Sequence, residues 1–559
     1  MIIEVLGEIF MPLGMAEIIN QVAEGKNILY IPGVCVLMIL CALMMMAGGV
    51  GGAYFGAKAS VNFASDLRRD VYAKIQEFSF ANIDKFSTGS LVTRTTNDIT
   101  QLQNFVNMLL RMFLRSPGMM IGAIIMAVSL KPSLAVVLAI SIPAMLLVQF
   151  CIIRHSFPLF RIMQKKLDTL NSTIQENLTN IRVVKSFVRE EFETEKFSNA
   201  NQDLKGSGIR AMSVMIMMMP LMMLFMNLST VVVLWLGGPM VAKGGMPIGD
   251  LSAFITYITQ ILMSLMMVSM MFMTSSRALA SAKRISEVLN EPLDLSDETA
   301  QQKDKKVENG SVEFKNVNFR YYKNSEGKVL DNISLKIETG KTIGIIGSTG
   351  CGKTTLVSLI ARLYDADEGE VLVDGVNVKD YSLENLRTGV GMVLQKNVLF
   401  SGTVAENLLW GDENATEKEL EAVANQAQAH EFIQNFTSGY NAEIEQGGSN
   451  VSGGQKQRLC IARALLKKPK ILILDDSTSA VDTATETKIR EAFKNELKDS
   501  TKIIIAQRIS SVIDADEIFV MDDGKITGHG THDFLLASNS EYQEIYASQM
   551  ENKSEGGAL

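Results

Sequence analysis

Long uncharged apolar runs fill the first half of the chain, whereas short apolar strands alternate with helical patterns in the second half. The clearest run, residues 30–54, is long enough to cross a bilayer of about 30 Å. Four further runs predict four more spans: 116–130, 134–153, 212–238 and 251–272. A sixth and weaker run, 2–19, contains Glu4, Glu8 and Glu17. Six crossings is therefore the expected count.

Two long polar segments separate these spans and contain most of the Lys and Arg of the first half. They cover residues 60–115 and 154–210, while the other connections carry one cation each, at Lys26, Lys131 and Lys243. Because cationic loops stay on the cytosolic side, both long segments are expected in the cytosol. Their amphipathic pattern predicts helices that extend the spans beyond the membrane.

The pattern changes after a polar linker. From residue 311 onwards, strands and helices alternate, with a polar–apolar alternation over 311–319 that is typical of an edge strand. We therefore predict an α-helical six-span membrane domain followed by an α/β domain. The expected boundaries are 1–277 for the membrane domain, 278–310 for the linker, 311–547 for the α/β domain and 548–559 for a polar tail.

Composition narrows the function classes. The net charge of −8 gives no sign of a nucleic-acid surface. The five cysteines are scattered, so the sequence predicts neither a disulfide framework nor a zinc site. The combination of long apolar runs with 20% charged residues indicates membrane and soluble parts in one chain.

A phosphate-binding loop is the first motif that indicates chemistry. It fits the pattern G-x-x-x-x-G-K-[ST] between a predicted buried strand, 342–346, and a predicted helix, 355–360. Glycines allow backbone amides to surround a polyphosphate, the lysine can reach the β- and γ-phosphates, and the threonine hydroxyl can bind Mg²⁺. The loop residues are Gly347, Ser348, Thr349, Gly350, Cys351, Gly352, Lys353, Thr354 and Thr355. The loop therefore predicts a site for a nucleoside triphosphate and Mg²⁺; the family resemblance described next implies that the nucleotide is ATP.

Further motifs resemble those of ABC exporters, in which a membrane domain is fused to an ATP-binding cassette. Residues 452–455 match the signature of that family and precede a predicted helix, whose N-terminus can bind a second anion. A predicted buried strand, 471–475, ends in a carboxylate. The resemblance implies that Asp475 holds Mg²⁺, that Gln395 contacts Mg²⁺ and the membrane-domain interface, and that Tyr321 stacks on adenine. The signature residues are Ser452, Gly453, Gly454 and Gln455. Residues 86–98 and 174–187 resemble the two coupling segments, and 479–482 the loop that crosses the dimer interface.

Two positions depart from the family pattern, and both concern hydrolysis. The glutamate that polarises the attacking water is replaced by Asp476, and the switch histidine by Gln507. Aspartate is one methylene shorter, and a misplacement of about 1 Å can cost on the order of 100-fold in rate. Glutamine can donate a hydrogen bond to a γ-phosphate, but it carries no positive charge.

With its intact signature, the chain therefore resembles the degenerate-site subunit of heterodimeric bacterial multidrug exporters. The resemblance implies an ATPase-coupled transporter in the bacterial cytoplasmic membrane, with a second half-transporter, membrane lipids and a small amphipathic or drug-like substrate as partners. A homodimeric lipid, drug or peptide exporter with slow hydrolysis stays open, as does a regulatory ATP-binding membrane protein. Exporters of this type begin with a basic helix before the first span, whereas this sequence opens within the first apolar run, so we expect the native start to lie upstream.

Overall fold

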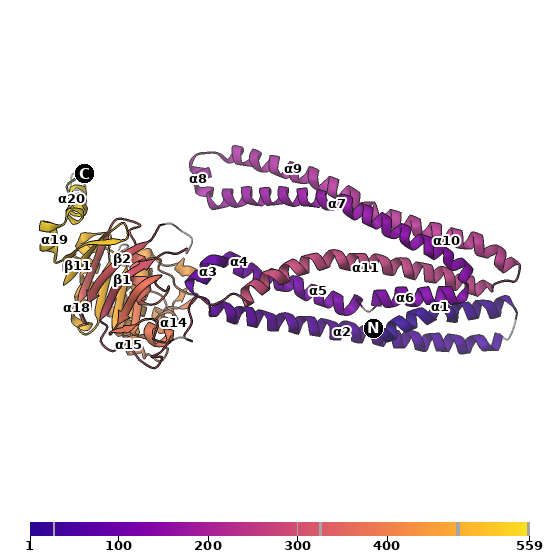
Figure 1. Cartoon of the computed structure of the whole chain (residues 1–559), viewed down its shortest axis with the longest axis horizontal. Coiled ribbons are helices and arrows are strands. Elements are labelled where there is room, and N and C mark those ends of the chain that lie inside the picture. The colour runs from indigo at the N-terminus through magenta and orange to yellow at the C-terminus, as the bar shows by residue number, and fades with distance from the viewer. Residues whose placement is uncertain (26–27, 114, 299, 323–326, 477–480, 556–559) are drawn as a thin grey trace. The chain divides into compact units, whose positions relative to one another are not determined.

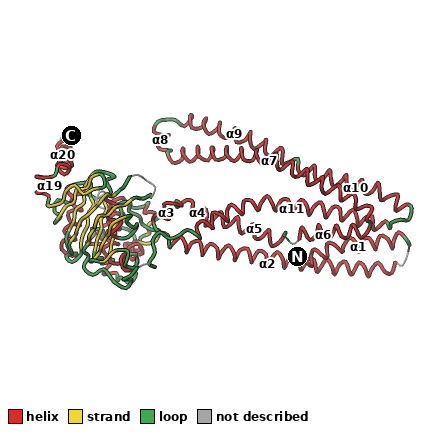
Figure 2. The backbone as a smooth tube through the Cα atoms, viewed as in Figure 1, coloured by secondary structure: helices red, strands yellow, loops and turns green. Residues whose placement is uncertain are grey.

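The computed structural model describes residues 1–25, 28–113, 115–298, 300–322, 327–476 and 481–555. It divides into two compact units. A helical unit contains Met1–Lys74 and Ser90–Asn290, and an α/β unit contains Ile75–Gly89 and Glu291–Leu559. The strands are confined to the second of these (Figure 2). Each unit is described by itself.

Long helices make up the helical unit (Figure 1). Its main helices are α1 (Ile2–Ala23), α2 (Ile31–Gln76), α5 (Ile99–Met112), α6 (Arg115–Leu130), α7 (Pro132–Thr179), α9 (Glu190–Ile216), α10 (Met218–Ala242) and α11 (Ile248–Leu289). Short elements connect them: the 3-10 turn η1 (Ile28–Tyr30), α4 (Thr88–Thr93), the π-helical turn η2 (Arg94–Asp98) and α8 (Ile181–Ser186). Helix α11 packs against α1, α5, α6 and α10, so it forms the centre of this unit.

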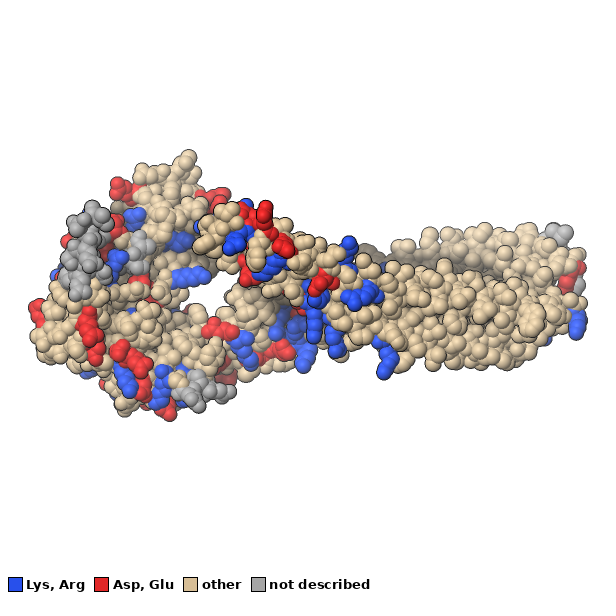
Figure 3. All heavy atoms as spheres, turned by 90° about the horizontal axis from the view of Figure 1, so that it is seen from above, with Lys and Arg blue, Asp and Glu red and all other residues tan. Residues whose placement is uncertain are grey.

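Five helical segments in the described residues are long and apolar enough to cross a membrane. They are Ile31–Gln76, Thr88–Leu130, Pro132–Thr179, Glu190–Ala242 and Ile248–Val268. The weak sixth candidate forms helix α1 but does not meet the same criteria, so the six-span count stays a prediction. On the face drawn in Figure 3, the apolar part of the helices shows a long surface without charged side chains.

Two of the three glutamates of α1, Glu4 and Glu8, pair with a cation within the helical unit. The Arg115 guanidinium lies 3.2 Å from Glu4 Oε1 and 2.6 Å from Glu8 Oε1. Tyr257 on α11 donates a 2.7 Å hydrogen bond to the carbonyl of Ile9. Because a charge in hydrocarbon is costly unless it is paired, the guanidinium explains how two glutamates are accommodated on an apolar helix.

Two sheets build the α/β unit. A six-stranded sheet has the order β12-β11-β3-β10-β9-β6, and a four-stranded antiparallel sheet has the order β2-β1-β4-β5. The six-stranded sheet contains β3 (Thr342–Gly347), β6 (Val390–Val393), β9 (Ile471–Asp475), β10 (Thr501–Ile505), β11 (Glu517–Asp522) and β12 (Lys525–Gly530). The four-stranded sheet contains β1 (Val312–Phe319), β2 (Leu330–Ile337), β4 (Glu368–Val373) and β5 (Val376–Asn377). A short pair, β7 (Gly402–Thr403) and β8 (Glu443–Ile444), lies apart from both.

Helices surround these strands. They are α12 (Lys353–Ile360), α13 (Leu383–Gly389), α14 (Val404–Leu409), α15 (Glu417–Gln426), α16 (His430–Gln434), α17 (Gly453–Leu466), α18 (Thr483–Glu496), α19 (His532–Ser538) and α20 (Ser540–Glu555), with 3-10 turns η3 (Gly439–Asn441), η4 (Gln446–Gly448) and η5 (Ile509–Ser511). Strands β9 and β10 are fully buried, in agreement with their unbroken apolar sequence.

One sequence prediction is wrong in detail. Strand β1 is not an edge strand, because it pairs with β2 on one side and β4 on the other. Its alternating pattern has a different cause, since only one of its faces is packed on the apolar core. The predicted first coupling segment, 86–98, is divided between the units: its residues up to Gly89 belong to the α/β unit with the rest of Ile75–Gly89, which contains α3 (Phe80–Phe86), and its other residues belong to the helical unit. Residues Ser79 and Asn82 form a capping box there, which fixes the start of this helix.

Candidate nucleotide site

Four parallel strands deliver the predicted site residues to one edge of the six-stranded sheet. The phosphate loop follows β3, Gln395 follows β6, Asp475 ends β9, and Gln507 follows β10. Parallel pairing places Asp475 opposite Ile505, so the segments after β9 and β10 leave the sheet side by side. In open α/β sheets, ligands bind at the carboxyl ends of the strands.

The phosphate loop connects β3 to the first turn of α12, which begins at Lys353, two residues before the predicted start. Gly350 and Gly352 have φ values of +89° and +99°, which L side chains rarely adopt. A Cβ at Gly347 would lie 2.0 Å from the carbonyl oxygen of Met521, so a larger residue cannot occupy this position without a backbone shift. These glycines are needed for the turn that directs backbone amides towards a phosphate.

The lysine of the loop is held by backbone oxygens of the loop itself. Lys353 Nζ donates to the carbonyls of Gly347 and Ser348 at 2.8 and 2.7 Å, and lies 3.7 Å from Cys351 Sγ. The Ser348 hydroxyl donates to Asp522 at 3.2 Å, while Cys351 is buried. Lys353 is therefore an ammonium group held within the loop at the N-terminus of α12, where a polyphosphate would add a stronger partner.

The Thr354 hydroxyl meets the carboxylate at the end of β9. Thr354 Oγ1 donates a 3.1 Å hydrogen bond to Asp475 Oδ1, while Asp475 Oδ2 is buried and has no hydrogen-bond partner among the described residues. Burial raises the pKa of Asp475, and the hydrogen bond from Thr354 opposes this shift. One hydroxyl and one orphaned carboxylate oxygen fit Mg²⁺, which binds through a few protein oxygens, waters and phosphates. Bound there, Mg²⁺ would neutralise developing charge on the phosphates.

The two residues that replace the hydrolytic consensus are bonded to each other. Gln507 Nε2 donates to Asp476 Oδ2 at 3.0 Å, and the side chain of Gln395 also hydrogen-bonds to this carboxylate. Burial raises the pKa of Asp476, while Gln395 and Lys353 act in the opposite direction. Asp476 has a left-handed backbone with φ of +47°, and its amide donates to the carbonyl of Ile505 at 3.0 Å. The structure thus places Gln395 and Gln507 at the Asp476 carboxylate, next to Asp475.

Tyr321, the predicted adenine-stacking residue, lies two residues beyond β1. Its hydroxyl shares a 2.8 Å hydrogen bond with Thr355 Oγ1, and its ring is 41% exposed. Tyr364 packs against it edge to face, with the two centroids 5.2 Å apart. The Tyr364 hydroxyl in turn donates to Asp84 of α3 at 3.1 Å. Burial raises the pKa of Tyr364, as does the negative charge of Asp84.

The signature residues form the N-terminus of α17. Ser452 is the N-cap: its hydroxyl accepts from the Gln455 amide at 3.3 Å, and Gln455 Oε1 accepts from the Ser452 amide at 2.9 Å. Helix α17 begins at Gly453, so both glycines belong to its first turn rather than preceding it. Ser452 and Gly453 are exposed. Among the described residues, the signature makes no hydrogen bond to the phosphate loop.

Sequence reasoning missed three residues of the site. Tyr364 and Asp84 were not predicted, because 280 residues separate them along the chain. Gln457, which is buried on α17, donates to the backbone carbonyl of Asp476 at 3.4 Å and links the signature helix to the end of β9. A glutamine among the otherwise apolar buried residues of this helix was the available signal, because buried amides need a partner. The predicted dimer-interface loop at 479–482 begins outside the described residues.

Comparison with known proteins settles the family. The family described as "ABC transporter transmembrane region" matches residues 1–265, and the family described as "ABC transporter" matches residues 330–479. An uncharacterized ABC transporter ATP-binding protein of Bacillus subtilis, YfiB, is 38% identical over 549 residues, which cover 98% of this chain and 95% of that protein. The chain belongs to the ABC transporter family.

Two other similar proteins extend the comparison. A protein of Mycobacterium tuberculosis named "Fatty acid ABC transporter ATP-binding/permease protein" is 36% identical over 481 residues, covering 86% of this chain and 75% of that protein. The structure of a bacterial Atm1-family ABC exporter with ATP bound superimposes with a TM-score of 0.82 at 25% identity, covering 98% of this chain and 97% of that one. The chain is thus an ABC exporter half-transporter with fused membrane and ATP-binding domains, and its family couples ATP hydrolysis to transport.

Proposed function

We propose that this half-transporter is the degenerate-site subunit of a heterodimeric exporter. The observation that carries the proposal is the pair formed by Asp476 and Gln507. Their 3.0 Å hydrogen bond joins a short carboxylate to an uncharged amide where hydrolysis requires a water-polarising glutamate and a histidine. Because Gln507 cannot become a cation and Asp476 is already bonded to two amides, this site binds ATP and hydrolyses it slowly.

The intact signature supports an active role in a second site. In this family each ATP lies between the phosphate loop of one cassette and the signature of the other. Ser452 and the first turn of α17 present exposed amides and a helix N-terminus, which favour an anion. A partner with glutamate and histidine at the hydrolytic positions would therefore form its competent site with this signature.

The surface of the helical unit also supports assembly with a second chain. In the 18-residue apolar window of α2, none of the residues is buried within this chain. Its exposed side chains include Leu37, Ile39 and Leu43. Lipid can cover part of such a helix, and a second membrane domain can cover the rest.

For the substrate we propose small amphipathic or drug-like molecules. The similarity to a mycobacterial protein named as a fatty acid transporter makes lipid-like acids a second candidate within the same amphipathic class. The exposed methionines of α10, such as Met219 and Met223, supply flexible and polarisable surface for varied apolar ligands.

Purification with and without candidate partner half-transporters tests the assembly. We expect the chain alone to bind labelled ATP in a Mg²⁺-dependent manner but to show little vanadate-sensitive turnover, whereas the pair should hydrolyse ATP and respond to substrate. A homodimer with full vanadate-sensitive turnover would contradict the proposal and favour the slow homodimeric exporter. Absence of transport by an ATP-hydrolysing pair in proteoliposomes, tested with amphipathic amines and fatty acids, would argue against the substrate class.

A further inference from the structure

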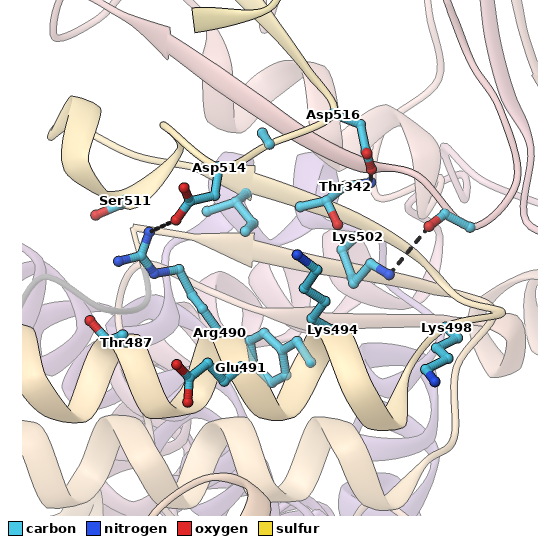
Figure 4. A pocket seen from close by; sticks show the side chains of 14 residues that line it. Thr342, Thr487, Arg490, Glu491, Lys494, Lys498, Lys502, Ser511, Asp514 and Asp516 are labelled. Atoms are coloured by element: carbon cyan, nitrogen blue, oxygen red, sulfur yellow. Dashed lines mark hydrogen bonds and ion pairs between the residues drawn. The ribbon is translucent and has the colours of Figure 1, made fainter.

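A cavity of about 630 Å³ lies in the α/β unit, away from the phosphate loop. Its walls are α18, the start of β3, β10 and the segment around η5, and none of the predicted nucleotide-site residues lines it. Small-molecule sites typically measure about 300–1,000 Å³, so this volume is sufficient for a metabolite. Both cationic and anionic side chains line it (Figure 4).

Several hydrogen-bond donors in this cavity are unused. Arg490 Nε is buried and has no partner among the described residues. The Lys494 amine and the Thr342 hydroxyl likewise make no hydrogen bond to any residue that the structure describes. Figure 4 shows the Lys494 amine directed towards Thr342, from the opposite wall. Of these donors only Arg490 Nε is buried without a partner, which is costly, so a ligand that supplies acceptors is favoured beside it, and the exposed Lys494 amine adds positive charge at the same place.

Two of the three carboxylates in the cavity already have partners. Asp516 accepts the Thr342 amide at 2.7 Å, and Asp514 lies 3.5 Å from Arg490 Nη1. The buried amine of Lys502 donates hydrogen bonds to the carbonyls of Gly340 and Leu497 at 3.3 and 2.9 Å. The Glu491 carboxylate is directed away from the Lys494 amine in Figure 4. The lining therefore carries four cationic side chains (Arg490, Lys494, Lys498 and Lys502) against three carboxylates.

We propose that this cavity binds a phosphate-bearing anion of the cytosol, either inorganic phosphate or a small phosphate ester. A phosphate group offers several acceptor oxygens and a negative charge, which match Arg490, Lys494 and the Thr342 hydroxyl. The cavity exceeds the roughly 30 Å³ share of one water about twenty-fold, so an ester fits as well as the free ion. The site is separate from the nucleotide site and would be occupied together with it.

Equilibrium dialysis of the full chain with radiolabelled inorganic phosphate tests this assignment. All samples carry Lys353→Ala, which removes the phosphate-loop cation and suppresses binding at the nucleotide site. We expect saturable binding of one phosphate per chain, weakened about ten-fold or more by Lys494→Ala, because a charge-assisted hydrogen bond is lost. Lys488→Ala is the matched control, because Lys488 is an exposed lysine of α18 that does not line the cavity.

Competition identifies the source of the phosphate group. Displacement by glucose 6-phosphate at lower concentration than by unlabelled phosphate indicates an ester, and the reverse order indicates the free ion; either supports the site. Lys494→Gln repeats the charge removal with a longer polar side chain, and its unfolding temperature shows that loss of binding is not loss of folding. Absent or non-saturable binding, or equal losses in the Lys494→Ala and Lys488→Ala chains, would overturn the proposal.

Discussion

The Ser452 hydroxyl allows the function of the signature to be separated from its role in helix stability. Ser452→Ala removes the acceptor for the Gln455 amide, a capping interaction typically worth about 1 kcal/mol. If the hydroxyl and the adjacent amides also stabilise charge on a partner's γ-phosphate, loss of one such donor should lower turnover by about 100- to 1000-fold. The second effect corresponds to about 3–4 kcal/mol in the transition state, so it exceeds the capping loss.

Thr416 provides a matched control in the same cassette. It is the N-cap of α15 and forms the same capping box with Glu419, yet it does not belong to the signature. Thr416→Ala should therefore destabilise the cassette by a similar amount and change ATP turnover less than two-fold. Ser452→Thr, which keeps a capping hydroxyl, should retain more turnover than Ser452→Ala.

Steady-state ATPase of the reconstituted pair is the assay, with thermal unfolding measured on every variant. In the same assay Asp476→Asn should reduce turnover only a few-fold, because the proposed competent site takes its carboxylate from the partner. Equal damage from Ser452→Ala and Thr416→Ala would show that the signature acts only through helix stability. If Asp476→Asn were as damaging as Ser452→Ala, the asymmetric mechanism would be wrong.

Three further predictions concern other parts of the α/β unit. Asp475→Asn should abolish Mg²⁺-dependent binding of labelled ATP. Since burial raises the pKa of Asp475, the parent chain should lose ATP binding on acidification at a pH that is still above the ordinary carboxyl pKa, whereas the variant should show no such step. Tyr364→Phe keeps the ring but loses the hydrogen bond to Asp84, so substrate stimulation of the ATPase should fall while the KM for ATP stays within about two-fold. The control is Tyr381→Phe, which loses a 3.0 Å hydrogen bond to the Val373 carbonyl and should leave substrate stimulation unchanged. Asp374→Ala should lower the free energy of unfolding by about 2 kcal/mol, because the carboxylate accepts hydrogen bonds from four backbone amides of residues 308–311. Since these amides lower the pKa of Asp374, the difference in stability between the parent chain and the variant should be full above the ordinary carboxyl pKa and should vanish as the pH falls through the lowered value. A difference that does not depend on pH would contradict the assignment.

Local sequence was sufficient for much of the fold and for the phosphate loop. The apolar run 471–475 and the strand before Gly347 carry their structure in adjacent residues, and both form where expected. The place of β1 inside its sheet depends on partners about 20 and 60 residues away, which periodicity cannot show. The contact of Tyr364 with Asp84 depends on chain folding over a still greater distance. Side-chain partners of this kind lie beyond pattern analysis, because the pattern records which face is apolar and not what covers it.

The left-handed backbone at Asp476 bears on how hydrolysis could be restored. With φ of +47°, the residue occupies a conformation that aspartate and asparagine tolerate better than longer side chains, for which it costs roughly 1–2 kcal/mol. A glutamate introduced at this position must therefore overcome backbone strain as well as find a water. A substitution at Gln507 alone leaves this geometry in place. If the site is impaired as proposed, Asp476→Glu alone should restore little activity, because the turn after β9 disfavours the longer side chain.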